Sequence, residues 1–196
     1  MGGQNADKDK VEALRAEIAR LEAELAAARA EISHLTAFAD QDPLMPEVLN
    51  RRAFMREMSR IMSFAARYDI EAALIYFDLN KFKAVNDTFG HATGDKVLRA
   101  VGATLRANVR DSDLVGRLGG DEFAVVLAKA APDDARAKAA ELARQVTAEE
   151  VRAEGGERVG IGCAYGVAPL TGKLDPEGAI KLADQAMYAM RAARSD

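Results

Sequence analysis

The chain has 196 residues, which suits one domain of ordinary size with an appended segment. It carries 27 lysines and arginines against 31 aspartates and glutamates, and a net charge of −4 argues against the concentrated basic face that nucleic-acid binding requires. The single cysteine, Cys163, excludes an internal disulfide, and no apolar run approaches the roughly 18 residues of a membrane span. We therefore expect a cytoplasmic protein that binds neither a membrane nor nucleic acid.

Residues 1–40 contain apolar side chains spaced alternately by three and four positions. The repeat consists of Val11, Leu14, Ile18, Leu21, Leu25, Ala28, Ile32 and Leu35. Mostly β-branched residues at one core position and mostly leucine at the other favour two parallel strands. The pattern predicts a dimerising coiled-coil helix of roughly 25 residues, about 37 Å long. The alternative is a single amphipathic helix packed on its own domain, but that arrangement usually needs a wider apolar stripe.

Residues 41–196 form a second region with a different pattern. Pro43 and Pro46 stop the helix of the first region. The expected elements are a helix over about 49–68, a strand ending at 78, a helix-loop-helix over about 81–109, two strands joined by a Gly-Gly pair, a helix from 132 to about 152, one or two strands through 167 and a helix from about 176. Strands that alternate with helices predict an α/β fold with a central sheet.

Two acidic clusters occupy positions that present side chains rather than bury them. Asp78 ends an apolar strand, and Asp121 and Glu122 follow the glycine pair of the predicted β-hairpin. If the two strands are neighbours, these carboxylates converge. Carboxylates are the hard oxygen ligands that Mg²⁺ prefers when it also holds substrate phosphates. A solvated turn carboxylate is the alternative for any one of them, but it does not account for both clusters beside a glycine turn.

The stretch after Asp78 offers groups for a nucleotide. The backbone N–H groups around Lys81 and Phe82 follow the strand directly and can form a loop-to-helix anion site. Asn86 and Asp95 are candidates for reading a guanine edge, because a carboxylate that accepts from two ring donors selects guanine over adenine. Taken alone, these two residues are also typical of a helix cap and a turn.

Several long motifs resemble those of GGDEF domains, the diguanylate cyclase family. R-L-G-G-D-E-F at 117–123 is similar to the signature hairpin, and F-D-L-N-K-F-K-A-V-N-D-T-F-G-H-A-T-G-D at 77–95 is similar to the nucleotide-binding stretch. N-R-R-A-F from Asn50 and A-D-Q-A-M-Y from Ala183 also match, so the resemblance covers about residue 42 to the C-terminus. It implies a palm-like, nucleotidyl-cyclase-like fold with a mostly antiparallel central sheet flanked by helices, over domain 41–196 behind the coiled coil of 1–40.

The resemblance also implies a reaction. Two GTP molecules would condense to cyclic di-GMP and pyrophosphate, with two Mg²⁺ or Mn²⁺ ions per active site and one GTP held by each subunit of a homodimer. Asp78, Asp121 and the Leu79 carbonyl would bind metal, and Glu122 would act as general base or second metal partner. Asp121 and Glu122 are thus the expected catalytic residues.

The remaining roles implied by the resemblance concern substrate. Asn86 and Asp95 would hold guanine with His91 nearby, and the backbone at Lys81 and Phe82 would meet the terminal phosphates. Where the family has a phosphate-binding lysine near the C-terminus, this chain has Arg191, and an arginine can also bind phosphate. The D-x-L-T opening of the family is changed here to Asp-Pro-Leu-Met at 42–45.

Arg110 and Asp113 form the R-x-x-D pair that the family uses as an inhibitory product site, so feedback inhibition by cyclic di-GMP is expected. The alternative for this pair is a surface salt bridge worth about 0–1 kcal/mol. For the whole protein, the rival functions are a non-catalytic cyclic di-GMP receptor and a coiled-coil scaffold. We expect an upstream sensor domain or a separate partner to supply the input signal.

Overall fold

The computed structural model describes residues 3–170 and 174–193, without the side chains of residues 3–11, 13, 30, 33–38 and 193. The chain divides into two compact units between Ala39 and Asp40. Of the predicted coiled-coil residues, Val11 and Leu35 have side chains outside the described residues. No helix in the described ranges is long and apolar enough to cross a membrane.

The first unit is helix α1 (Gly3–Asp40). Its apolar seam is exposed in the single chain: Leu14, Ile18, Leu21, Leu25 and Ile32 keep between 50% and 64% of their surface. Surface ion pairs support the helix, with Arg20 contacting Glu17 and Glu24 at 2.7 Å each. The predicted helix is therefore present, and its pairing with a second copy stays a prediction.

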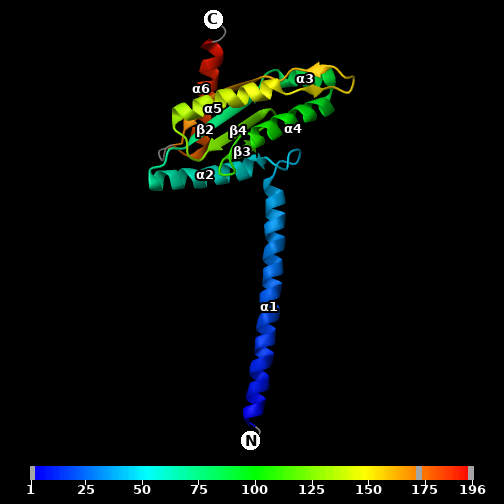
Figure 1. The fold of residues 1–196 in the computed structure, drawn as a ribbon, viewed down its shortest axis with the longest axis vertical. Coiled ribbons are helices and arrows are strands. Elements are labelled where there is room, and N and C mark those ends of the chain that lie inside the picture. Colours follow the sequence, from blue (N-terminus) through cyan, green and yellow to red (C-terminus); the bar gives the residue numbers. More distant parts are fainter. Residues whose placement is uncertain (1–2, 171–173, 194–196) are drawn as a thin grey trace. The chain divides into compact units, whose positions relative to one another are not determined.

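The second unit is built on a five-stranded sheet in the order β1-β3-β4-β2-β7 (Figure 1). The strands are β1 (Leu49–Asn50), β2 (Ala73–Leu79), β3 (Leu114–Arg117), β4 (Glu122–Leu127) and β7 (Cys163–Pro169). Only the β1–β3 pairing is parallel; the other three are antiparallel. The predicted α/β fold with a mostly antiparallel sheet is confirmed, and so is the hairpin between β3 and β4.

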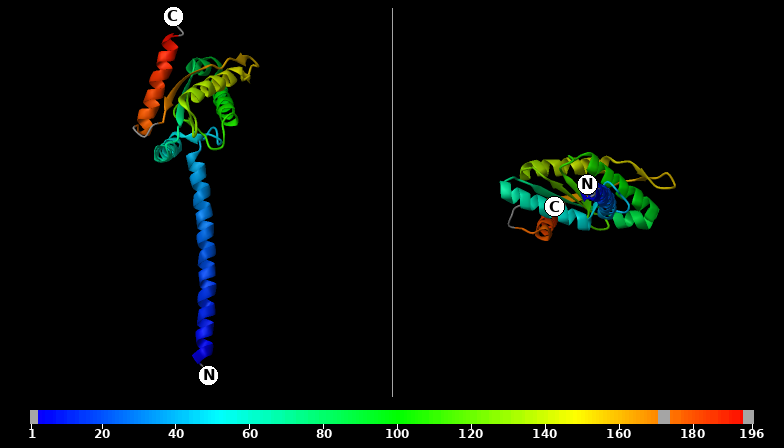
Figure 2. Two further views of the ribbon diagram at one scale, coloured as in Figure 1. Left: turned by 60° about the vertical axis from the view of Figure 1, so that its left-hand side comes forward. Right: turned by 90° about the horizontal axis from the view of Figure 1, so that it is seen from below.

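Helices cover both faces of the sheet (Figure 2). On one face lie α4 (His91–Ala107) and α5 (Pro132–Ala148), and on the other lie α2 (Arg51–Tyr68) and α6 (Pro176–Ala193). Successive residues of a strand point to opposite faces, so Phe77 joins the α4–α5 side whereas Tyr76 joins the α2–α6 side. Asp78 shares its face with Tyr76, which places the acidic strand end beneath α6.

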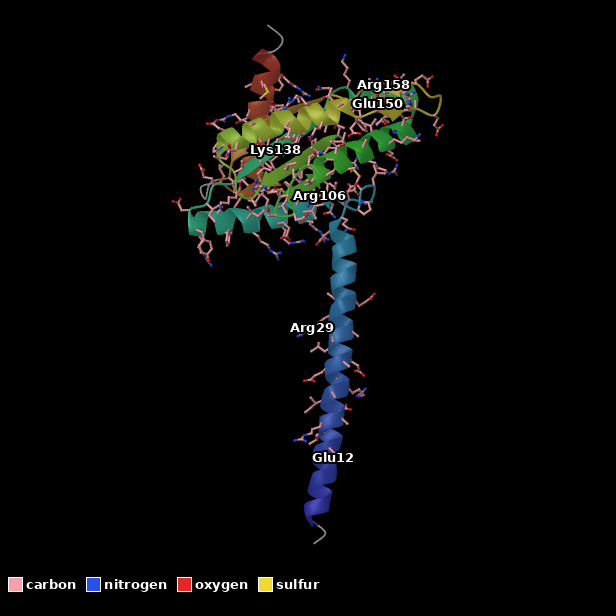
Figure 3. The ribbon with its side chains drawn as sticks, viewed as in Figure 1. Glu12, Arg29, Arg106, Lys138, Glu150 and Arg158 are labelled. Atoms are coloured by element: carbon pink, nitrogen blue, oxygen red, sulfur yellow. The ribbon has the colours of Figure 1, made fainter. Side chains whose placement is uncertain are left out.

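Two boundaries differ from the sequence expectation. The helix expected from about 49 begins at Arg51, because the Asn50 side chain caps it by accepting from the Ala53 N–H at 3.0 Å. The helix expected to reach 152 ends at Ala148, and Val151 instead opens a short hairpin of β5 (Val151–Arg152) and β6 (Arg158–Val159). Burial of Val151 in the core favours the strand there. Glu150 and Arg158 pair at 2.8 Å beside this hairpin (Figure 3).

Candidate active site

The two predicted acidic clusters meet at one end of the sheet. Strands β2 and β4 are antiparallel neighbours whose register sets Asp78 opposite Glu122. Directly opposed residues of an antiparallel pair project from the same face, so both carboxylates lie on the α2–α6 side. The Leu79 N–H donates to the Asp121 carbonyl at 3.2 Å, which brings the hairpin turn to the end of β2. The convergence expected from the sequence is therefore present.

Negative charge is concentrated at this end of strands β2 and β4, which we call the acidic edge and which consists of Asp78, Asp121 and Glu122. Partial burial raises the pKa of Asp121 above its usual range, and the neighbouring Asp78 and Glu122 carboxylates raise it further, whereas Arg117 acts in the opposite direction. Both effects disfavour the ionised form. A divalent cation would relieve the repulsion, and the carboxylates of Asp78 and Asp121 are the hard oxygen donors that Mg²⁺ and Mn²⁺ take. The donor set therefore fits the implied metal.

Arg117 fixes the hairpin that carries these carboxylates. Its Nε donates to the Gly119 carbonyl at 3.0 Å and its Nη2 to the Gly120 carbonyl at 2.8 Å, while Nη1 lies 3.5 Å from Asp42 Oδ2. A β-carbon on Gly119 would meet the flexible carboxylate end of Glu122, so the glycine lets that side chain approach the turn. The hairpin geometry thus depends chiefly on the guanidinium of Arg117.

Arg191 reaches the same edge from α6. Its Nη2 donates to Asp78 Oδ1 at 2.7 Å and to Asn80 Oδ1 at 2.8 Å. In the described ranges, no three Asp, Glu, His or Cys side chains gather closely enough to hold a cation as they stand. One of the predicted metal-binding carboxylates is instead engaged by the predicted phosphate-binding arginine.

The sequence reasoning did not identify Tyr76 as part of this site. It is 5% exposed, and burial, followed by the neighbouring Glu122 carboxylate, raises the pKa of its hydroxyl. The available signal was strand periodicity, because a residue two positions before Asp78 must share its face. Asn80, the partner of Arg191, was also missed, and no local pattern indicates that contact.

The residues predicted to read guanine lie on two consecutive helices. Helix α3 (Phe82–Phe89) carries Asn86, and α4 carries Asp95. A β-carbon on Gly94 would collide with the Asn86 amide oxygen, so Asn86 lies against the residue that precedes Asp95. His91, the first residue of α4, is exposed. The structure therefore brings these three residues to one region.

The start of α3 carries the expected phosphate contacts. Lys81 precedes the helix in the left-handed conformation, with φ of 57°, which is uncommon for a residue with a side chain. Phe82 is the first residue of the helix. Strained positions of this kind concentrate at functional sites, which is compatible with the expected anion-binding backbone.

The Arg110–Asp113 turn lies apart from the acidic edge, after α4. Asp113 is 7% exposed, and its two carboxylate oxygens accept the Arg110 N–H at 3.0 Å and the Ala128 N–H at 3.1 Å. Arg106 of α4, labelled in Figure 3, donates to the Arg110 and Asp113 carbonyls. The Arg110 residue itself is exposed.

A cavity of about 430 Å³ opens beside this turn. Its charged and polar lining consists of Asn108, Arg110, Asp113, Lys129, Asp134 and Lys138. Lys138 comes from α5 (Figure 3), so the cavity gathers cations from two loops and a helix. Its apolar lining comes from Ala107, Val109, Leu127 and Ala130.

Comparison with known proteins identifies relatives of similar sequence. The chain is 36% identical over 145 residues to the diguanylate cyclase DosC of Escherichia coli K12, which covers 74% of this chain and 32% of that protein. It is 38% identical over 150 residues to the diguanylate cyclase TpbB of Pseudomonas aeruginosa, covering 74% and 34%. The chain thus spans about a third of the length of these curated relatives.

Among solved structures, the coiled coil and GGDEF domain of DgcB from Caulobacter crescentus, in complex with c-di-GMP, superimposes with a TM-score of 0.80. The two chains are 26% identical, with 92% of this chain and 95% of the other covered. Residues 39–196 match the family described as "Diguanylate cyclase, GGDEF domain". With the Gly-Gly-Asp-Glu-Phe hairpin closing an acidic sheet edge of the family's fold, the chain belongs to the GGDEF family of diguanylate cyclase domains.

Proposed function

We propose that this protein is a diguanylate cyclase that condenses two GTP molecules into cyclic di-GMP and two pyrophosphates. The observation that carries the proposal is the pairing of Asp78 with Glu122 across β2 and β4, with Asp121 crowded against both. Excess negative charge at a sheet edge costs stability unless a cation compensates for it. A family member that had become a simple receptor would have no need to retain this arrangement.

The acidic edge is the proposed reaction centre. Asp78, Asp121 and the Leu79 carbonyl would hold divalent cations, which when bound neutralise phosphate charge and favour ionisation of the attacking hydroxyl. The 3′-oxygen of one GTP bonds to the α-phosphorus of the other, the α–β bridging bond breaks and pyrophosphate leaves. Glu122 is positioned to accept the 3′ proton or to serve as a further ligand, and Tyr76 lies on the same face of the sheet.

The α3–α4 region is the proposed guanine site. Asn86 and Asp95 supply the amide and carboxylate that pair with the guanine edge, and His91 lies at the adjacent helix start. The backbone at Lys81 and Phe82 and the guanidinium of Arg191 serve the phosphates. The cations and phosphates would thus lie at the acidic edge, and the guanine base would lie between α3 and α4.

Each domain holds one GTP, so two copies must face each other to close the ring. We propose that α1 brings them together as a parallel two-stranded coiled coil through its exposed seam at Leu14, Ile18, Leu21 and Leu25. The marginal length of the seam and the small Ala28 in it predict a weak dimer whose activity rises with concentration. An upstream sensor or a partner that tightens α1 would raise activity.

We further propose that product inhibits the enzyme at the Arg110–Asp113 turn. Arg110, which is exposed, and Lys129 line one cavity together with Lys138, whose ammonium also pairs with Glu141 at 3.1 Å, and this set of cations suits the phosphates of a cyclic dinucleotide. Structures of the relative DgcB have been solved in complex with c-di-GMP.

The deciding experiment is incubation of purified protein with GTP and Mg²⁺, followed by chromatography of the nucleotides. Formation of cyclic di-GMP with pyrophosphate supports the proposal. Binding of cyclic di-GMP without turnover at any concentration would instead identify a receptor. Leu21→Asp should give a folded monomer that binds GTP and makes little product, and full activity of that monomer would contradict the role of α1.

A further inference from the structure

Arg191, which we expect to bind phosphate, donates a hydrogen bond to Asp78, which we expect to bind a cation. Its Nη2 lies 2.7 Å from Asp78 Oδ1, in an ion pair whose side chains are 40% and 28% exposed, respectively. The same nitrogen donates to Asn80 Oδ1 at 2.8 Å. An arginine that serves only phosphate has no reason to lie on a carboxylate that serves metal.

This contact and cation binding at Asp78 compete for the same oxygen. Mg²⁺ requires its oxygen ligands at about 2.1 Å in near-octahedral geometry. A guanidinium within hydrogen-bonding distance of Oδ1 blocks that approach sterically and adds a positive charge beside it.

Asn80 gives Arg191 a second, uncharged anchor. It follows Leu79 at the end of β2, and its N–H donates to the Gly162 carbonyl at 2.8 Å, which fixes its backbone. An amide oxygen accepts from a guanidinium without holding it as strongly as a carboxylate does. Arg191 can therefore release Asp78 and turn toward an anion while Asn80 still contacts it.

We propose that Arg191 is a positioning residue that serves as the internal counter-ion of Asp78 before loading and exchanges Asp78 for a nucleotide phosphate when GTP and its cation bind. The inference rests on the proposed function and extends it to the order of loading. Cation alone binds weakly because Arg191 must first leave Asp78. Cation with nucleotide binds well because the released guanidinium gains a phosphate partner, for which its planar donor fork is suited.

The signature of this role is two effects of opposite sign. Arg191→Gln should raise the affinity for Mn²⁺ alone by roughly three- to fivefold, the scale of a part-exposed ion pair. The same variant should lower the affinity for a GTP analogue with a non-cleavable α–β bridge, measured with saturating Mn²⁺, by roughly tenfold or more. A purely structural role would weaken both kinds of binding.

Calorimetric titration of the 196-residue chain with Mn²⁺, without and with the analogue, tests the proposal. Lys181→Gln is the matched control, because Lys181 is exposed on the same helix, ten residues or about 15 Å from Arg191. It should leave both affinities within twofold of wild type. Arg191→Lys keeps the charge without the fork, and it should bind Mn²⁺ alone about as wild type does.

Unchanged or weaker Mn²⁺ binding by Arg191→Gln would overturn the inference, and so would an equal gain in Arg191→Lys. Should the glutamine variant fail to fold by circular dichroism, the lysine variant decides, because tighter Mn²⁺ binding by it would remove charge competition as the cause. Asp78→Asn distinguishes failure of the Arg191 inference from failure of the proposed function. Loss of Mn²⁺ binding in that variant upholds the metal site even if Arg191 has no effect, whereas no Mn²⁺ binding by any protein, with or without analogue, would overturn the proposed function itself.

Discussion

Aspartates are used in opposite ways at the acidic edge and at the Arg110–Asp113 turn. Asp113 is 7% exposed, and each of its carboxylate oxygens accepts a backbone N–H, so its charge is balanced where it lies. Partial burial, and then the neighbouring Asp78 and Glu122 carboxylates, raise the pKa of Asp121 above its usual range. One aspartate stabilises the fold and the other costs stability. The aspartates that we propose to serve chemistry are those that lie beside other carboxylates, whereas Asp113 is satisfied by backbone N–H groups.

The largest expected effect is on turnover at the acidic edge. Asp78→Asn keeps the shape of the side chain but removes the charge that would hold a cation, so cyclic di-GMP formation should fall by about a thousandfold, equivalent to several kcal/mol of transition-state stabilisation. The initial rate with GTP and Mg²⁺ measures it. Asp133→Asn, at an exposed position at the start of α5, is the control and should keep the wild-type rate. A rate within tenfold of wild type for Asp78→Asn would contradict the metal assignment.

Strand and turn patterns were enough to predict the acidic edge. The apolar run before Asp78 and the glycine pair before Asp121 each have a local signature, and antiparallel pairing of neighbouring apolar strands follows from general sheet behaviour. The roles of Asn86, His91 and Asp95 at guanine stay predictions. The helical first segment was also predictable, because heptad spacing is a local property.

Contacts between distant positions were not predictable in this way. Arg191 and Asp78 are 113 residues apart, and only the packing of α6 on the sheet brings them together. Likewise, Asp113 accepts the N–H of Ala128, fifteen residues later, and the sequence did not predict this buried contact; the role of Asp113 in product binding stays a prediction. The short β5–β6 hairpin replaced the expected helix end because tertiary burial of Val151 overrides local helix propensity.

The second prediction concerns stability at the turn. Asp113→Ala removes the acceptor for two backbone N–H groups, each of which costs about 1–3 kcal/mol when left unsatisfied and buried. We expect a loss of about 2–4 kcal/mol in the free energy of unfolding, measured by urea denaturation. Arg110→Ala, at an exposed position in the same turn, should change stability by less than about 0.5 kcal/mol. Equal losses in the two variants would show that Asp113 is not a structural cap.

Arg110→Ala should act on regulation instead. A charge-assisted hydrogen bond to a product phosphate is worth about 1.5–3 kcal/mol, so the inhibition constant for cyclic di-GMP should rise roughly ten- to a hundredfold. The initial rate without product should be unchanged. Progress curves at increasing cyclic di-GMP concentration measure both quantities. Identical inhibition of wild type and variant would place the product site elsewhere.

The smallest expected effect is a gain in stability, and it tests most directly whether Asp121, unlike Asp113, destabilises the fold. Asp121→Asn removes a carboxylate whose ionised form is disfavoured, first by burial and then by Asp78. In EDTA at pH 7 the variant should unfold at a higher temperature than wild type although it has lost turnover. A gain of about 1 kcal/mol corresponds to roughly 2–4 °C in Tm for a chain of this length.

The pH dependence of that gain identifies its cause. Because the folded-state pKa of Asp121 is raised above its ordinary value of about 4, ionised Asp121 destabilises wild type fully only above the folded pKa. As the pH falls through that pKa toward the ordinary value, wild-type Asp121 takes up a proton more readily folded than unfolded, and its penalty disappears. The asparagine side chain does not titrate there, so the difference in Tm between the two proteins should shrink steadily between pH 7 and pH 4. Asp133→Asn should show no such trend. A pH-independent difference would mean that the amide stabilises the hairpin by a new hydrogen bond, and a lower Tm for Asp121→Asn at pH 7 would mean that the acidic edge is balanced after all.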